Sequence, residues 1–213
     1  MTPKRSSRSK SGAIVPRFGN LRVENWRNFG QFEVELERRV FLVGPNASGK
    51  SNFLDVFRFL HDIASPGGGL QDSVGRRCGV SSLRSLAARR YSDILVGVEV
   101  RSNSEAPVWR YELQFSQDNL QRATIKREQV WKDGVEILNR PDSDDGDDPE
   151  RLTQTYLEQV NVNRPFRELA EFFATIRYLH ILPQLVREHD RSLGRRNDPY
   201  GGDFLEQIAA TQE

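Results

Sequence analysis

The sequence contains little of what disulfide-bonded, zinc-binding or thiol-dependent proteins require. Its single cysteine, Cys78, excludes an internal disulfide framework and fits a reducing cytosol. Its three histidines stand alone, with no second histidine or cysteine at ligand spacing, which argues against a zinc site. No histidine lies near Cys78 in the sequence to suggest a nucleophilic triad. None of these chemistries is therefore expected.

The sequence also lacks a long apolar run and an excess of charge of one sign. No segment approaches membrane-spanning length, and no secretion signal follows the basic N-terminus. We therefore expect a cytoplasmic protein with no membrane partner. The 31 basic and 30 acidic residues nearly cancel, so the net charge does not indicate nucleic acid. An apolar content of 37% suffices for a globular core.

Local charge is less even than the total. Residues 1–16 are rich in Ser, Lys, Arg and Pro and are expected to form a disordered basic arm, which either touches nucleic acid or only solubilises the chain. Residues 141–150 contain acids and no base and predict a solvated surface loop. A third group, of arginines, is compatible with binding to a DNA backbone or with an ordinary solvated face; its members are Arg76, Arg77, Arg84, Arg89 and Arg90.

The segment 17–64 carries a strand, loop and helix pattern. Alternating apolar residues predict two half-buried strands that are joined around 28–31. Val40–Val43 is apolar throughout, which predicts a third strand covered on both faces. Apolar residues at helical spacing then predict a helix that stops by Pro66.

The rest of the chain changes its period twice. Alternation over 94–100 and 109–115 predicts strands of an antiparallel meander that spans 92–140, with Asp133-Gly134 as a tight hairpin turn. The segment 151–213 is expected to be largely helical, with helical spacing over 151–174 broken by Pro165. Within it we expect a short strand at 178–182 and a last helix that starts at Asp203.

The strongest motif is a glycine-rich loop between the third predicted strand and the first predicted helix. Its residues fit the pattern G-x-x-x-x-G-K-[ST] and are Gly44, Pro45, Asn46, Ala47, Ser48, Gly49, Lys50 and Ser51. In such a loop the main-chain N–H groups converge on phosphate oxygens, the lysine binds the β- and γ-phosphates, and the hydroxyl ligates Mg²⁺. The sequence therefore predicts a site for a nucleoside triphosphate, ATP above all, together with Mg²⁺.

Around this loop the chain resembles the N-terminal lobe of RecF/SMC/OLD-type ATPases of the ABC class, P-loop proteins of the AAA family. The resemblance rests on Asn25-Trp26-Arg27-Asn28-Phe29 and on Gly44 to Ser51 followed by Asn52. It implies an α/β fold, the P-loop NTPase lobe of an ABC-type ATPase head, with an antiparallel β-meander subdomain and added helices. Trp26 and Asn28 depart from the family pattern.

The resemblance also implies further site residues and partners. Asn52 and Arg27 are expected near the nucleotide, although Arg27 is equally compatible with an ordinary surface position. Gln184 is a candidate for the glutamine loop that senses the metal and the γ-phosphate, or else a polar residue after a proline turn. A homodimer through the nucleotide is implied for the full-length protein. No residue is assigned a catalytic role.

The family's hydrolysis motifs do not occur in the 213 residues: neither a signature segment nor an apolar strand ending in Asp-Glu is found. The strand at Ile94–Glu99 ends in one carboxylate only, and its alternation fits the meander. We therefore expect the front half of an ATPase, from a shortened form, a disrupted gene or a split protein, with no hydrolysis by this chain alone.

Three functions remain open. The first is an ATP-binding lobe that acts with DNA in genome maintenance or anti-phage defence. The second is a non-enzymatic module in which nucleotide gates assembly with a nuclease or another partner. The third is a different P-loop enzyme, a kinase or a GTPase, although the chain has no Asn-Lys-x-Asp guanine reader and a long meander is unlike a compact kinase.

Overall fold

The computed structural model describes residues 16–85, 93–101, 107–181, 183–187 and 209. The chain divides into two compact units, which are treated separately below. The first consists of Met1–Leu42, Arg84–Ser116 and Thr124–Leu152. The second consists of Val43–Leu83, Gln117–Ala123 and Thr153–Glu213.

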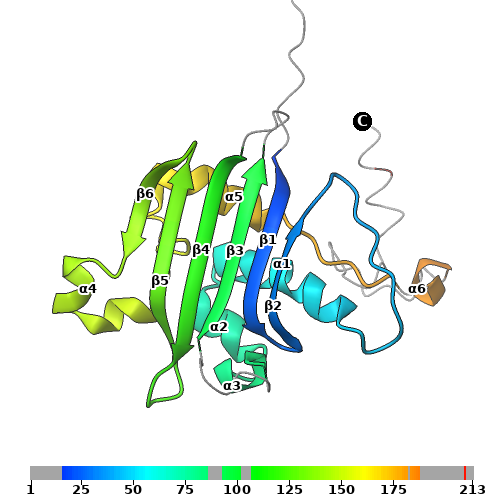
Figure 1. Cartoon of the computed structure of the whole chain (residues 1–213), viewed down its shortest axis with the longest axis horizontal. Helices are drawn as coiled ribbons and strands as arrows, with labels where there is room; N and C mark the ends of the chain where they lie inside the picture. Colours follow the sequence, from blue (N-terminus) through cyan, green and yellow to red (C-terminus); the bar gives the residue numbers. More distant parts are fainter. Residues whose placement is uncertain (1–15, 86–92, 102–106, 182, 188–208, 210–213) are drawn as a thin grey trace, which may run out of the picture. The chain divides into compact units, whose positions relative to one another are not determined.

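One six-stranded sheet dominates the first unit (Figure 1). Its strands are β1 (Arg17–Trp26), β2 (Phe29–Glu35), β3 (Ile94–Arg101), β4 (Pro107–Gln117), β5 (Ala123–Lys132) and β6 (Val135–Arg140). Their spatial order is β2-β1-β3-β4-β5-β6, and β1 pairs antiparallel with both β2 and β3. The N-terminal hairpin and the meander are therefore parts of the same sheet.

One face of this sheet is apolar and buried. Leu21 pairs with Val98 and Val23 with Val96, and all four side chains are almost completely buried. The same face continues through alternate residues of β4, which are Trp109, Tyr111, Leu113 and Phe115. Burying a side chain of this size stabilises a fold by about 1.5–3 kcal/mol relative to exposure. The alternation predicted from the sequence is confirmed.

The opposite face is charged. Arg22 of β1 and Arg110 of β4 lie with their guanidinium groups 4.0 and 3.2 Å from the carboxylate of Glu112, and Arg127 of β5 also pairs with it. Glu112 is itself buried. A buried carboxylate is tolerated because these cations compensate its charge.

The β5–β6 hairpin turns where the sequence predicts. Lys132 pairs with Val135, which leaves Asp133 and Gly134 as the two central residues of the turn. Their φ angles are 49° and 82°. A tight hairpin of this kind needs positive φ at both positions, which glycine adopts without steric cost and aspartate tolerates.

The apolar segment Val40–Val43 does not form the predicted strand. Residues 36–49 contain no strand, and Phe41 and Val43 are 86% and 94% exposed. A strand is stabilised by hydrogen bonds to a neighbouring strand, and no described strand pairs with this segment. The apolar composition of this segment predicts that it is buried. It does not determine whether a neighbouring strand is available to pair with it.

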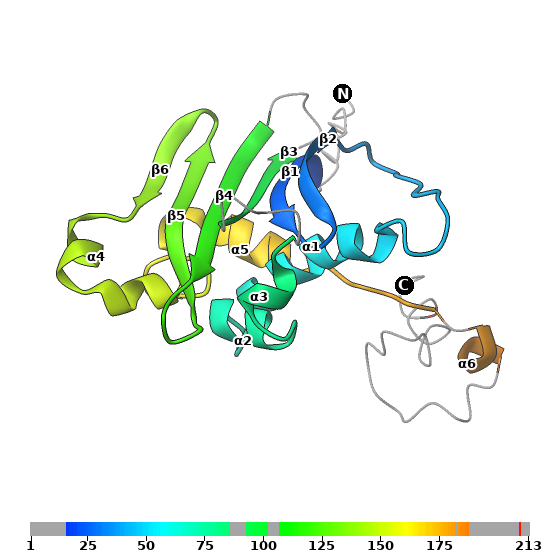
Figure 2. The ribbon, with the colours of Figure 1, turned by 60° about the horizontal axis from the view of Figure 1, so that its bottom comes forward.

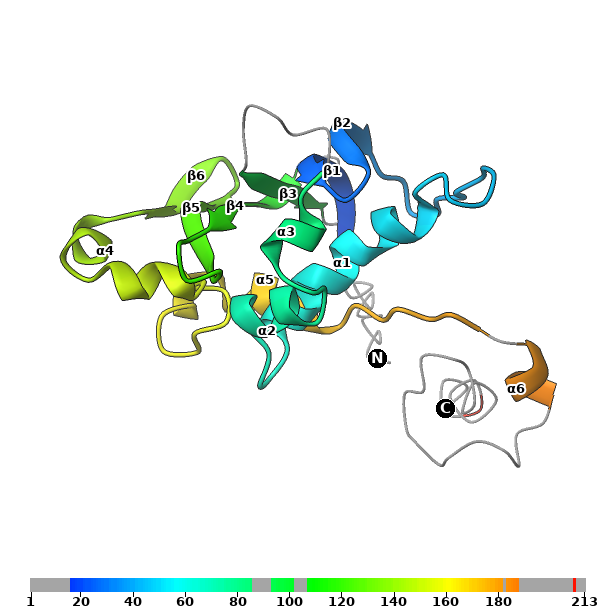
Figure 3. The same cartoon turned by 90° about the horizontal axis from the view of Figure 1, so that it is seen from below.

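The second unit is mainly helical. Its helices are α1 (Lys50–Ala64), α2 (Leu70–Gly75), α3 (Val80–Leu83), the 3₁₀ helix η2 (Arg164–Phe166), α5 (Arg167–Ala174) and α6 (Pro183–Arg187). The central helix α1 contacts α5 and α2 (Figures 2 and 3). It buries one stripe of side chains, Val56, Phe59, Leu60 and Ile63, and ends at Ser65, as its spacing predicts.

Two further predictions for the second half are wrong in part. Of the segment 151–174, only Arg167–Ala174 forms an α-helix; the 3₁₀ helices η1 (Pro149–Thr153) and η2, with bends and turns between them, occupy the rest. Tyr156 and Leu157 are buried there without being helical, so burial alone produced the helix-like spacing. Residues 177–181 form no strand, since no described strand pairs with them. The arm over 1–15, Leu182 and the start of the helix at Asp203 lie outside the described residues.

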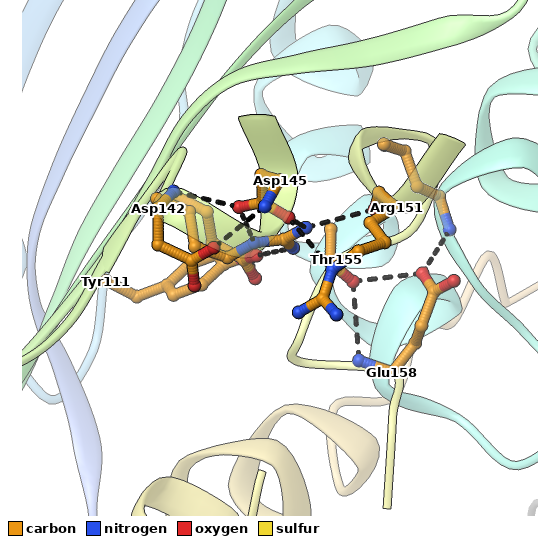
Figure 4. A network of polar contacts seen from close by, with 9 residues as sticks. Tyr111, Asp142, Asp145, Arg151, Thr155 and Glu158 are labelled. Atoms are coloured by element: carbon orange, nitrogen blue, oxygen red, sulfur yellow. Dashed lines mark hydrogen bonds and ion pairs between the residues drawn. The ribbon is translucent and has the colours of Figure 1, made fainter. Parts of the chain in front are cut away.

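The acidic segment after β6 is more ordered than a solvated loop. It forms α4 (Ser143–Asp147), whose N-terminus is closed by reciprocal hydrogen bonds (Figure 4). The Asp142 carboxylate accepts from the Asp145 N–H at 3.0 Å, and the Asp142 N–H donates to the Asp145 carboxylate at 3.1 Å. Asp145 is buried, unlike the other acids of the segment. Across the parts of the chain that the structure describes, no helix has the length and apolar character to cross a membrane.

Candidate nucleotide-binding site

The glycine-rich loop is curled immediately before α1. Ala47 and Gly49 have φ angles of 62° and 100°, and the Ser48 N–H donates to the Pro45 carbonyl at 3.3 Å. A Cβ atom on Gly44 would lie 2.9 Å from the Ser48 hydroxyl, so the Ser48 side chain would have to move to admit any larger residue there. Residues 44–48 are exposed, which leaves the loop open to a ligand.

The Lys50 side chain folds back over this loop. Its ammonium donates to the carbonyl oxygens of Gly44 at 2.8 Å and Pro45 at 2.7 Å, and lies 3.5 Å from the Ser48 hydroxyl. A cation is thereby held beside the curled main chain. This is the placement that an anion-binding loop requires.

The start of α1 adds a second source of positive potential. Gly49 is the N-cap residue and contributes no capping side chain, and the first turn contains no acidic residue. The first N–H groups of a helix have no intrahelical partner, and the dipole of a 15-residue helix favours an anion at this end. Ser51 is exposed in this turn and Asn52 is half-buried.

These features fit a polyphosphate. The loop supplies main-chain donors, Lys50 supplies a cation, and the start of α1 supplies the positive end of the helix dipole. The exposed Ser51 hydroxyl is the oxygen donor best placed by the motif to hold Mg²⁺. The chemistry of the donors thus matches the predicted ligand and metal, while the assignment of individual residues stays a prediction.

Two of the predicted site residues, Arg27 and Gln184, lie outside the glycine-rich loop. Arg27 belongs to the first unit, in the turn between β1 and β2, with a φ of 55°. Gln184 lies exposed in the short helix α6 of the second unit, after a residue outside the described part of the chain. Both assignments remain predictions.

The sequence alone did not predict that Arg77 is buried against α1. Its Nε and Nη2 atoms lie 3.1 and 2.9 Å from Oδ1 of Asp55, and its Nη1 donates to Asp62 Oδ2 at 2.8 Å. The guanidinium also lies over the Phe59 ring, 5.3 Å from its centroid. Arg77 therefore contacts α1 at positions 55, 59 and 62, which share one helical face.

This contact changes the interpretation of the arginine cluster. Only 4% of the Arg77 side chain is exposed, so it is not available to a DNA backbone. Arg76 pairs with Asp72 at 2.8 Å, Arg84 is exposed, and Arg89 and Arg90 lie outside the described residues. The signal in the sequence was the pair of aspartates on the apolar face of α1, which need a buried cation.

A further polar contact in the second unit fixes the start of α2. The Leu70 N–H donates to the Glu158 carboxylate at 2.7 Å, and the Thr155 hydroxyl donates to it at 2.9 Å. Thr155 and Glu158 are labelled in Figure 4. The carboxylate is surrounded by donors and presents no reactive arrangement, so we interpret it as structural.

The fold and the loop define a P-loop protein of the AAA class. Residues 39–191 match the family model described as "AAA domain, putative AbiEii toxin, Type IV TA system". The match covers more than half of the chain, and the chain belongs to this family. The predicted recognition is thereby confirmed at the level of an AAA-domain family. A search of curated proteins found no match.

Solved structures with a similar chain path include two of the recombination mediator protein RecF. The structure with ATP is 21% identical with a TM-score of 0.38, and covers 58% of this chain and 29% of the RecF chain. The structure with ATPrS is 24% identical with a TM-score of 0.37, over 57% of this chain and 28% of that one. This chain therefore spans less than a third of either RecF chain.

A third similar structure comes from a study of "ATP-driven dimerization and DNA stimulated activation of SMC ATPases". It is 16% identical with a TM-score of 0.37, and covers 57% of this chain and 72% of that chain. The helices and the six-stranded antiparallel sheet of this chain agree with the predicted α/β fold class.

Proposed function

We propose that this chain binds ATP with Mg²⁺ through the loop from Gly44 to Ser51 and Asn52. One observation supports the proposal above the others: the Lys50 ammonium lies on a curled, exposed loop at the start of α1. Membership of an AAA-domain family and the likeness to RecF, solved with ATP, agree with it.

Each residue of the site has a physical role in this proposal. Lys50 moves from its carbonyl partners to the β- and γ-phosphates, since a charged ligand is a stronger partner than two neutral oxygens. Ser51 holds the metal, and Gln184 is proposed as a second metal contact and Arg27 as a further cation. Bound Mg²⁺ supplies additional charge neutralisation of the phosphates.

Calorimetry on the purified chain tests the proposal. We expect heat on titration with Mg-ATP, and its loss in Lys50→Ala. Thermal unfolding should change little, because both hydrogen bonds of the Lys50 ammonium are exposed to solvent. Lys126→Ala removes the same charge from an exposed position of β5 and should bind normally. Absence of heat with the unsubstituted chain, or equal binding by Lys50→Ala, would contradict nucleotide binding by this loop.

We further propose that the 213-residue chain does not turn ATP over alone. Hydrolysis needs groups that orient water and clamp the γ-phosphate, and the sequence contains neither an Asp-Glu strand nor a signature segment. In the full-length protein a second copy would complete the site as a homodimer through the nucleotide. Steady phosphate release by this chain, abolished by Lys50→Ala, would overturn this part.

A role with DNA is proposed for the full-length protein. The family description includes a type IV toxin–antitoxin system, which supports anti-phage defence over genome maintenance. Anisotropy of labelled duplex DNA with and without Mg-ATP tests it, and binding that weakens with salt is expected. If nucleotide instead changes only the mass of the assembly, without DNA binding, the alternative of a nucleotide-gated module for a nuclease or other partner is favoured.

A further inference from the structure

The buried arginine of the second unit lies close to the nucleotide site along the helix. Asp55, which Arg77 contacts through two nitrogens, is four residues after Ser51, about 6 Å along the axis of α1 at 1.5 Å per residue. Asp62, its other partner, is eleven residues after Ser51, about 16 Å along the axis. One of the two carboxylates is therefore about one turn from the phosphate-binding end.

We propose that Arg77 is a positioning residue of the nucleotide site. It fixes α1 against the segment that follows α2, and it neutralises Asp55 so that this carboxylate does not repel the phosphates of bound ATP. The inference rests on the proposed function, and it deepens it by assigning a role to a residue outside the glycine-rich loop.

Charge supports this assignment. Asp55 and Asp62 place two negative charges on a single face of α1, and Arg77 supplies a cation to both at 2.8–3.1 Å. Without that cation the Asp55 carboxylate would oppose the favourable potential of Lys50 and of the helix start more strongly. The distance between Asp55 and the phosphate end is shorter than the screening length of about 10 Å at 0.1 M salt.

Geometry supports it as well. Arg77 makes hydrogen bonds to Asp55, to Asp62 and to the Ser73 carbonyl at 2.8 Å, so it joins α2 to α1 through a single buried group. A guanidinium is suited to this because its fork of donors is planar and rigid. The orientation of α1 depends on these hydrogen bonds of Arg77, and the positions of Lys50 and Ser51 depend on that orientation.

Four variants of the full chain separate this role from a purely structural one. Asp55→Asn removes the charge next to the site and leaves Arg77 paired with Asp62. Asp62→Asn removes the same charge from the same ion-pair cluster, about two turns further from the site, and is the matched control. Arg77→Met and the double variant Arg77→Met/Asp55→Asn complete the set. Mg-ATP dissociation constants and thermal unfolding are measured for each.

The expected pattern is specific. Asp55→Asn binds Mg-ATP about two- to fivefold more tightly than the unsubstituted chain at low salt, and the gain shrinks in 0.5 M salt. Asp62→Asn changes the affinity less. Arg77→Met binds about three- to tenfold more weakly, and the double variant recovers most of that loss although it is no more stable.

Each outcome decides the inference. If Asp55→Asn binds no more tightly than Asp62→Asn, or if the double variant binds as weakly as Arg77→Met, Arg77 is only a structural residue. Should Arg77→Met not fold, the comparison of the two aspartate variants still decides. Failure of the unsubstituted chain to bind Mg-ATP would instead overturn the proposed function, so the two failures are distinguishable.

Discussion

Arg140 and Asp145 form a two-point ion pair that is closed to solvent. Arg140 Nη2 donates to Asp145 Oδ1 at 2.7 Å and its Nε donates to Oδ2 at 2.9 Å, and both side chains are 0% exposed. Arg140 also donates to Glu128 at 3.0 Å, and Glu128 accepts from the Tyr111 hydroxyl at 3.2 Å. Tyr111 and Asp145 are labelled in Figure 4. The pair joins β6 to the acidic segment that follows it.

The first prediction concerns acid stability. Burial opposes ionisation of Asp145, but hydrogen bonds from Arg140 outweigh it and lower the pKa of Asp145 from 3.8 to about 2. A depressed carboxyl pKa stabilises the fold above the unfolded pKa, and that stability is lost as pH falls towards the folded pKa. Between pH 5 and pH 3 this group should contribute about 1 kcal/mol less to the free energy of unfolding.

Urea unfolding of the unsubstituted chain and of Asp145→Asn at both pH values measures this contribution. The difference in stability between the two should be smaller at pH 3 than at pH 5. Asp144→Asn is the control, since Asp144 is exposed in the same helix. A difference that does not depend on pH would show that the ion pair does not set the pKa of Asp145.

The second prediction concerns the backbone of the glycine-rich loop. Gly49 has a φ of 100°, in a region where a Cβ is strained, so Gly49→Ala should destabilise the loop by about 1 kcal/mol or more and weaken Mg-ATP binding. Ala47 already bears a Cβ at a φ of 62°. Ala47→Gly should therefore retain binding. Equal effects of the two substitutions on the dissociation constant would contradict the curled geometry.

The third prediction tests the corrected placement of Val40–Val43. Phe41 is 86% exposed, so Phe41→Ala should change the free energy of unfolding by less than about 0.5 kcal/mol. Phe59 is fully buried in α1, and Phe59→Ala should cost about 3–5 kcal/mol. Chemical unfolding of both variants compares them. A large cost at Phe41 would restore the buried strand that the sequence alone predicts.

Much of this fold follows from local sequence pattern. Period-two alternation predicts β3 and β4, the Asp133-Gly134 pair predicts the hairpin, and apolar spacing predicts α1, because each is a property of neighbouring residues. Which strands pair is not local. The insertion of β1 between β2 and β3 joins residues more than seventy positions apart, and no periodicity records it.

The candidate site divides in the same way. The residues from Gly44 to Ser51 are contiguous, so the motif can be recognised in the sequence. The curvature of the loop follows from Gly49 and from the start of α1 directly after it. Arg77 contacts Asp55 across 22 residues. In sequence it looks like one of several loop arginines, and only the fold distinguishes the buried one from its neighbours.

The last prediction concerns Gln184. If its side chain contacts the bound metal, as the family resemblance implies, its loss should weaken the binding of ATP only when Mg²⁺ is present. We expect Gln184→Ala to raise the dissociation constant for Mg-ATP about tenfold, equivalent to about 1.4 kcal/mol, because one oxygen ligand of the metal is lost. With EDTA its affinity for ATP should equal that of the unsubstituted chain.

Gln31→Ala, in β2 of the other unit, is the matched control, because Gln31 is also an exposed glutamine. Fluorescence titration with and without Mg²⁺ gives the ratio of the two dissociation constants for each variant. A ratio that is the same for Gln184→Ala and Gln31→Ala would remove Gln184 from the site. The metal would then be left to Ser51 and the phosphates, since Ser51 lies in the first turn of α1 and does not depend on α6.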